Sequence, residues 1–138
     1  MRFSHKIELV ENVSEPQAIL AGSSPLQINE NYTPTASVTL FHGDRLDLLR
    51  SIPAASAQLI VTSPPYNIGK QYERRQSLKT YLADQAATIA ACAKLLTNAG
   101  SICWQVGNHI GKDQEVYPLD ILLYPIFKEH GLRLRNRI

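Results

Sequence analysis

Cysteine is scarce in this chain, and its two cysteines stand apart from any pattern that binds metal or forms a disulfide framework. Cys92 and Cys103 have no CxxC partner and no histidine at the spacing of a zinc site. Two cysteines are also too few for the bridged scaffold of a small secreted protein. We therefore expect no metal and no disulfide, and we interpret both residues as small core residues of a protein of the reducing cytoplasm.

Long hydrophobic runs and a strong charge imbalance are also absent. Residues 1–6 lead into polar sequence, so we expect neither a signal peptide nor a membrane span. The 14 basic and 12 acidic residues leave a formal charge of +2, which allows a nucleic-acid partner without requiring one. With 138 residues, 44% of them hydrophobic, the chain has the size and composition of one globular domain.

Regular periodicity is missing from residues 1–37, where apolar clusters are short and are separated by Asn, Ser, Pro and Glu. A stretch of this kind cannot bury a continuous face, so we predict a loosely ordered N-terminal arm with room for one short strand. The folded domain is expected to cover residues 38–138. Because the chain ends inside the last apolar alternation, without a cap or a polar tail, we expect a truncated domain.

Strand and helix patterns alternate within residues 38–138. Short β-branched and aromatic runs predict strands, and leucines at three- and four-residue intervals predict helices. This order predicts an α/β fold: a mostly parallel sheet with helices on both faces. The expected strands are 38–41, 59–61, 102–106 and 132–138, and the expected helices are 45–50, 78 to the stop at 98–100, and 119–127, kinked or interrupted at Pro125.

Two polar segments follow predicted strands directly. One is Gly43 with Asp44, and the other begins at Ser63 and ends at Tyr66. Ligands of open parallel sheets bind beyond the carboxyl ends of the strands, so the two segments would line one crevice if their strands were neighbours. Asp44 is also well placed to cap the helix that follows it.

The segment of Ser63, Pro64, Pro65 and Tyr66 combines three chemical elements. The Ser63 hydroxyl and the Pro64 carbonyl are hydrogen-bond acceptors, and the two prolines hold them rigidly. Tyr66 offers an aromatic surface on which a base can stack. Such a set suits chemistry on an amino group of a base, whose delocalised lone pair must be drawn out toward a methyl donor.

With the preceding Thr62, this segment resembles the catalytic signature of the N4-cytosine/N6-adenine DNA methyltransferases. The resemblance implies a Rossmann-like S-adenosylmethionine-dependent methyltransferase fold over residues 38–138, and a double-stranded DNA substrate whose target base is flipped out. Serine before the two prolines is typical of the N4-cytosine branch. The surrounding similarity is carried by His42 to Asp44, Leu48, Leu49, Ile52 and Pro53 upstream, and by Asn67 to Gly69, Gly100, Val106 to Asn108 and Arg135 to Ile138 downstream.

The resemblance also implies roles for individual residues. Ser63, Pro64, Pro65 and Tyr66 would be catalytic. Gly43 and Asp44 would bind S-adenosylmethionine, with Asp44 contacting its adenosine part. Basic residues just past the signature would meet the phosphates of the DNA, although a solvated charged loop is the simpler interpretation; they are Lys70, Arg74 and Arg75.

A Gly-x-Gly sequence is absent from the chain. The resembling family places a glycine-rich loop beneath the methionine part of the cofactor, and one class of it carries that loop after the catalytic motif. We therefore expect the loop in a C-terminal segment or in a separate chain. N6-adenine methylation, a catalytically inactive DNA-binding remnant and half of a split enzyme remain alternatives to a restriction-modification N4-cytosine methyltransferase.

Overall fold

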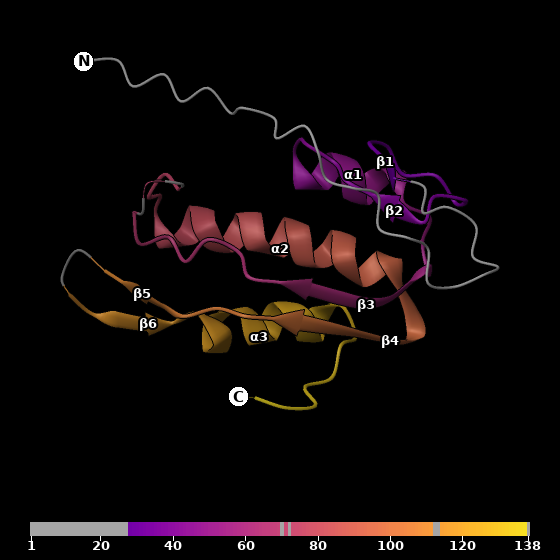
Figure 1. The fold of residues 1–138 in the computed structure, drawn as a ribbon. Coiled ribbons are helices and arrows are strands. Elements are labelled where there is room, and N and C mark those ends of the chain that lie inside the picture. The colour runs from indigo at the N-terminus through magenta and orange to yellow at the C-terminus, as the bar shows by residue number, and fades with distance from the viewer. Residues whose placement is uncertain (1–27, 70, 72, 112–113, 138) are drawn as a thin grey trace, which may run out of the picture.

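The computed structural model describes residues 28–137 with the exception of 70, 72, 112 and 113. Most of the predicted N-terminal arm, residues 1–27, therefore lies outside the described residues. The described residues form strands and helices, whose arrangement Figure 1 shows. In chain order the elements are β1 (Ile28–Asn29), β2 (Val38–Thr39), α1 (Arg45–Ser51), β3 (Ala57–Thr62), α2 (Leu78–Leu95), β4 (Leu96–Trp104), β5 (Asn108–Ile110), β6 (Val116–Pro118) and α3 (Leu119–Glu129).

The strands form three separate two-stranded sheets over the described residues. β1 pairs with β2 and β3 pairs with β4, both in parallel, whereas β5 and β6 form an antiparallel hairpin. The prediction of an α/β fold with parallel strands is confirmed at this level. The carboxyl ends of β3 and β4 point toward the end of the molecule from which the hairpin projects (Figure 1).

The first two helices begin where polar side chains cap them. The Asp44 carboxylate accepts a hydrogen bond from the Leu46 amide at 2.7 Å, and the Ser77 hydroxyl accepts one from the Thr80 amide at 3.1 Å. Each cap satisfies an N–H group that has no partner within its helix. The predicted starts of both helices are therefore confirmed.

The core lies around α2, which packs against α1 and against α3. Ile89 of α2 and Leu119 and Leu123 of α3 are almost completely buried. The ring of Trp104, at the end of β4, meets Phe127 of α3 edge to face at a centroid distance of 5.5 Å. Apolar burial at these contacts is the main force that holds the helices to the sheet.

The two faces of the β3–β4 sheet differ in their surroundings. Strands alternate side chains between faces, and the register pairs Leu59 with Ser101 and Val61 with Cys103. All four of these side chains are exposed, Leu59 at 60% and Val61 at 70%. We call this side of β3–β4 the open face, because no helix covers it among the described residues.

The two cysteines lie in different surroundings. Cys92 is buried in α2 as predicted, whereas Cys103 lies on the open face and is exposed. The interpretation of Cys103 as a core residue is therefore wrong for the structure as described. Its strand pattern was recognised, but alternation alone does not show which face of a strand is covered.

Several predicted boundaries shift in the structure. α2 ends at Leu95 and β4 begins at the next residue, so Gly100 lies inside β4 and does not stop the helix. α3 continues through Pro125. The described part of the predicted last strand, 132–137, has no strand structure, and Arg137 instead pairs with Asp120 of α3 at 2.6 Å.

Within the described residues, no helix is both long and apolar enough to cross a membrane. The same residues contain no group of three or more histidine, cysteine, aspartate or glutamate side chains that could hold a metal ion.

Candidate active site at the carboxyl end of β3

The predicted catalytic segment begins directly after β3. The amide of Gln105 donates to the Thr62 carbonyl at 2.9 Å, so the parallel pairing reaches the last residue before the segment. Ser63 is exposed, and its Oγ lies 3.1 Å from the hydroxyl of Tyr66. The structure therefore brings the side chains of Ser63 and Tyr66 into hydrogen-bond contact across the two prolines.

The ring of Tyr66 rests against the backbone of Gly107, just past the end of β4. A Cβ atom placed on Gly107 would lie 3.3 Å from Cδ2 and 3.4 Å from Cε2 of the ring. These distances are tighter than ordinary van der Waals contact, so any side chain at Gly107 would push the ring. Glycine here allows the close approach of ring and backbone.

Asn67 follows the segment and is 2% exposed, with a left-handed φ of 59°. Asparagine tolerates this conformation better than most residues. Its side-chain Nδ2 donates to the Gln76 carbonyl at 2.8 Å, and its Oδ1 accepts from the Gln76 amide at 2.7 Å. The two bonds join the beginning of the loop to the residue before the α2 cap.

Glu73 supplies the acceptors for three consecutive backbone amides of this loop. Its Oε2 accepts from Asn67 N at 2.9 Å, and its Oε1 accepts from Ile68 N at 2.7 Å and Gly69 N at 2.9 Å. The left-handed φ values of Asn67 and Gly69, 59° and 80°, turn successive amides toward one point. Such a backbone concavity is an anion site, which here holds the carboxylate of the chain itself.

His109 joins the loop to the β5–β6 hairpin. Its Nδ1 lies 3.0 Å from the Asn67 carbonyl, and the side chain is buried. Because a carbonyl oxygen can only accept, Nδ1 carries the proton in this arrangement. A second link comes from Arg75, whose guanidinium donates to the Ile110 carbonyl of β5.

Tyr81 of α2 is buried near the loop, and its hydroxyl has no hydrogen-bond partner. Burial raises the pKa of Tyr81 to about 12, and the carboxylates of Glu73 and Asp84 act in the same direction. The phenol is therefore neutral at physiological pH.

The predicted DNA-contacting residues are not in equivalent settings. Lys70 lies outside the described residues. Arg74 is exposed, and Arg75 is also exposed although one of its nitrogens is used at Ile110. The hydrogen bond from Arg75 to the Ile110 carbonyl links the loop to β5, and the sequence did not indicate it.

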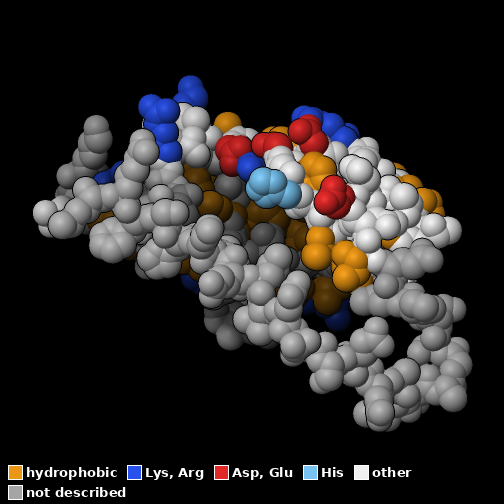
Figure 2. All heavy atoms as spheres, turned by 45° about the horizontal axis from the view of Figure 1, so that its top comes forward, with side chains coloured by type: hydrophobic (Ala, Val, Ile, Leu, Met, Phe, Trp, Pro, Cys, Tyr) orange, Lys and Arg blue, Asp and Glu red, His pale blue; other side chains and the backbone are white. Residues whose placement is uncertain are grey.

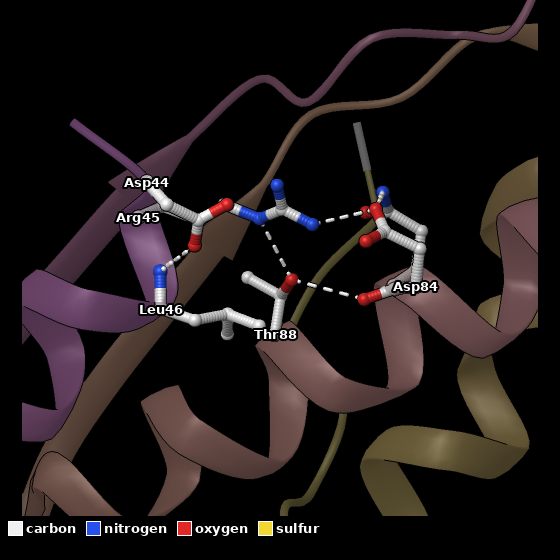
Figure 3. Close-up of polar contacts among 6 residues, drawn as sticks. Asp44, Arg45, Leu46, Asp84 and Thr88 are labelled. Carbon is white, nitrogen blue, oxygen red and sulfur yellow. Dashed lines mark hydrogen bonds and ion pairs between the residues drawn. The ribbon is translucent and has the colours of Figure 1, made fainter.

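The predicted cofactor residues Gly43 and Asp44 lie at the start of α1. Figure 3 shows Asp44 bound to the Leu46 amide, with Arg45 reaching across to α2. The Arg45 guanidinium donates to Thr88 Oγ1 at 2.9 Å and to Asp84 Oδ2 at 2.5 Å. Asp44 is therefore the N-terminal cap of α1. Its side chain is exposed, and the Leu46 amide occupies only one of the two carboxylate oxygens.

The structure does not place the two polar segments on neighbouring strands. β2, which precedes Gly43, pairs with β1, and β3, which precedes Ser63, pairs with β4. A single crevice lined by both segments is therefore not formed by adjacent strands within the described residues.

Acidic and basic side chains lie next to one another on the face shown in Figure 2, where the top of Figure 1 is turned forward. The described side chains visible there form no broad patch of one sign. This view agrees with the small net charge of +2 and shows no positively charged groove for DNA among the described residues on that face.

The profile of the DNA methylase family N6_N4_Mtase matches residues 57–138, which is more than half of the chain. The match includes β3, the segment from Ser63 to Tyr66, and every element that follows. The chain therefore belongs to the N6/N4 DNA methylase family.

Relatives with known names agree with this assignment. The chain is 43% identical over 99 residues to the type II methyltransferase M.BglII of Bacillus subtilis, and the match covers 72% of this chain and 28% of that protein. It is 37% identical over 67 residues to the DNA adenine methyltransferase YhdJ of Escherichia coli K12, covering 46% and 23%. The chain thus spans about a quarter of the length of these curated relatives.

A solved structure gives the same result for the fold. TTHA0409 of Thermus thermophilus, assigned as a DNA modification methylase, superposes with a TM-score of 0.58 at 26% identity. The superposition covers 68% of this chain and 38% of that one.

Sequence reasoning missed the residues that hold the loop. Glu73 and Gln76 stand in a polar stretch without periodicity, and His109 had no partner at a recognisable spacing. Two local features of the sequence indicate such a loop. Asn followed closely by Gly is typical of backbone with positive φ, and a carboxylate a few residues later can accept hydrogen bonds from the backbone N–H groups. The contact of His109 with Asn67 joins residues far apart in the chain and carries no local signal.

Proposed function

We propose that this chain is part of a DNA methyltransferase that transfers a methyl group from S-adenosylmethionine to the exocyclic N4 amine of cytosine. The observation that carries the proposal is the contact between Ser63 and Tyr66 at the carboxyl end of β3. It places a hydrogen-bond acceptor and an aromatic surface side by side, with the Pro64 carbonyl between them in the chain.

The proposed roles follow from the chemistry of an aromatic amine. The Ser63 hydroxyl and the Pro64 carbonyl accept the amine hydrogens and draw the nitrogen lone pair out of conjugation with the ring. Tyr66 stacks on the flipped base, and Pro65 limits the motion of the segment. When bound, S-adenosylmethionine would supply the activated methyl group, and the electron pair of the S–C bond would stay on its sulfur. The proton that the amine loses as the N–C bond forms would pass to solvent water, with the acceptors at Ser63 and Pro64 holding the amine in place.

Cofactor binding by this chain is proposed for Gly43 and Asp44. The exposed Asp44 carboxylate uses one oxygen for the Leu46 amide, so the other is suited to accept from a ribose hydroxyl. These residues fit the adenosine part only, because the chain contains no Gly-x-Gly loop for the methionine part. Arg74, Arg75 and Lys70 are proposed to meet DNA phosphates.

The open face supports a proposal about the complete fold. Leu59 and Val61 are exposed apolar side chains on a parallel sheet, and parallel sheets are normally covered on both faces. We propose that residues 38–138 complete a Rossmann-like sheet with helices on both faces together with a further segment or a separate chain that carries the glycine-rich loop. Residues 1–37 are proposed to be an N-terminal arm, whose described end joins the domain through the pairing of β1 with β2.

The base specificity is proposed from the serine before the two prolines. N6-adenine methylation is the second candidate, favoured by the similarity to YhdJ, which is named an adenine methyltransferase. The test is mass spectrometry of nucleosides from DNA treated with the methyltransferase that contains this chain. N4-methylcytosine is the expected product, N6-methyladenine would select the second candidate, and no modified base would select the inactive DNA-binding remnant.

A further inference from the structure

We infer that Asn67, Glu73 and His109 form a positioning network that holds Tyr66 and Ser63 in the geometry needed for methyl transfer. The inference rests on the proposed function, because it gives the network a role in that reaction. None of the three side chains is proposed to touch the substrate; each acts through the backbone around Tyr66.

The loop conformation depends on an internal anion. The three amides of Asn67, Ile68 and Gly69 converge on one carboxylate, with N–O distances from 2.7 to 2.9 Å. Asn67 and Gly69 both have positive φ. Glycine adopts this conformation freely, whereas at Asn67 it persists because the surrounding contacts hold it. The first of these amides belongs to the residue next to Tyr66, so the carboxylate of Glu73 fixes the direction in which the chain leaves the catalytic segment.

The Asn67 side chain closes the loop from the other end. Both of its polar atoms bind the backbone of Gln76, which precedes the Ser77 cap of α2. The described residues at the two ends of this loop are thereby joined next to α2, the helix at the centre of the core. A buried side chain whose polar atoms are all satisfied is a rigid connection.

The hairpin segment contacts Tyr66 and its neighbour from a third direction. Gly107 lies against the Tyr66 ring, and His109, two residues later, binds the Asn67 carbonyl. The segment from Gly107 to His109 therefore holds both the ring and the peptide that follows it. Displacements of about 1 Å at a reacting centre are enough to cost on the order of a hundredfold in rate.

The first test uses Glu73→Gln and Asn67→Gly in the complete methyltransferase that contains this chain. Glu73→Gln keeps the shape of the side chain but replaces an acceptor oxygen by a donor, and Asn67→Gly removes the side chain while still allowing positive φ. We expect kcat to fall on the order of a hundredfold, while the KM for S-adenosylmethionine and the Tm stay near the unsubstituted values. Glu129→Gln, the same change at an exposed position on α3, is the matched control and leaves kcat unchanged.

The second test measures amide hydrogen exchange in the same variants and does not depend on turnover. In Glu73→Gln the amides of residues 67–69 are expected to exchange about tenfold faster, while those of Ile89 and Cys92 in α2 are unchanged. Two outcomes overturn the inference. One is unaltered exchange at residues 67–69, and the other is a lowered Tm in both variants that accounts for the whole loss of kcat.

A parallel Tyr66→Ala variant separates the proposed function from the positioning network. If Tyr66→Ala keeps full turnover, the proposed function fails. If Tyr66→Ala is inactive while Glu73→Gln and Asn67→Gly keep full kcat, only the positioning network is overturned.

Discussion

Tyr66 is held by contacts of different kinds. Its hydroxyl meets Ser63 Oγ, and its ring meets the backbone of Gly107. Stacking of a flipped base requires the ring, whereas the contact with Ser63 requires the hydroxyl. Single substitutions at this residue can therefore separate the two contributions.

Replacing Tyr66 by alanine removes the proposed stacking surface, and base stacking on an aromatic side chain is worth about 1–3 kcal/mol. We expect Tyr66→Ala to reduce methyl transfer by the complete enzyme by about 5- to 150-fold, since about 1.4 kcal/mol corresponds to a factor of ten. Tyr66→Phe keeps the ring and is expected to retain most of the activity. The measurement is incorporation of labelled methyl groups into DNA, and equal rates for Tyr66→Ala and the unsubstituted enzyme would reject the stacking role.

At the scale of elements, the pairing of β4 with β3 is irregular at the start of β4 and regular toward its end. Between the pairs Ala57–Leu96 and Leu59–Ser101 the register with β3 shifts, and the regular ladder runs only from Leu59 onward. Gly100 lies in this irregular stretch, close to the carbonyl of Ala57, the first residue of β3. The irregularity lets the chain pass directly from α2 into the sheet.

Gly100→Ala is expected to destabilise the chain by about 1–3 kcal/mol, the usual cost of overpacking. The added Cβ would lie 2.9 Å from the Ala57 carbonyl oxygen and 3.1 Å from the Thr97 amide, and backbone atoms cannot move aside cheaply. Ser101→Ala, at the next position on the open face, is the control and should change stability by less than about 0.5 kcal/mol. Urea denaturation measures both, and an unchanged midpoint for Gly100→Ala would contradict the described packing.

The two cysteines differ in exposure, because they lie on different sides of the β3–β4 sheet. Cys103 is exposed on the open face, whereas Cys92 is buried in α2, where burial raises the pKa of its thiol. A higher pKa leaves less thiolate, the reactive form, at a given pH. We expect a thiol reagent at mildly alkaline pH to modify Cys103 in the folded chain and Cys92 only on unfolding. Mass spectrometry after partial labelling identifies the site, and faster labelling of Cys92 would contradict the assignment of the faces.

At the scale of the whole molecule, the described elements cover one side of a short parallel sheet. The helices α1, α2 and α3 enclose the core, and exposed apolar side chains remain on the open face. The chain spans 28% of the length of M.BglII. These facts agree with the proposal that a further segment or a separate chain completes the sheet.

The isolated chain is therefore expected to bind S-adenosylmethionine weakly, because the residues proposed to bind it, Gly43 and Asp44, would contact the adenosine part alone. Titration calorimetry should give no saturable heat at micromolar cofactor; affinity in that range would overturn this prediction. Addition of a segment that carries the glycine-rich loop is expected to raise the affinity and to protect Cys103 from thiol reagents. Cys103 labelling at an unchanged rate would show that the open face is not where that segment packs.

The sequence by itself determined the family and the starts of the first two helices. Ser63, Pro64, Pro65 and Tyr66 are contiguous, so their pattern identifies the family without any knowledge of the fold, and the caps at Asp44 and Ser77 follow from contacts a few residues long. Their physical basis is local, and local patterns are visible in a sequence.

Only the tertiary structure decided which face of β3 is covered, where β5 and β6 lie, and what holds the segment from Ser63 to Tyr66. Three-residue strands carry too little periodicity to predict. The bond from His109 to Asn67 and the approach of Gly107 to Tyr66 join positions about 40 residues apart. Such contacts arise from the packing of the hairpin against the loop, because proximity in space between distant residues is a property of the folded chain alone.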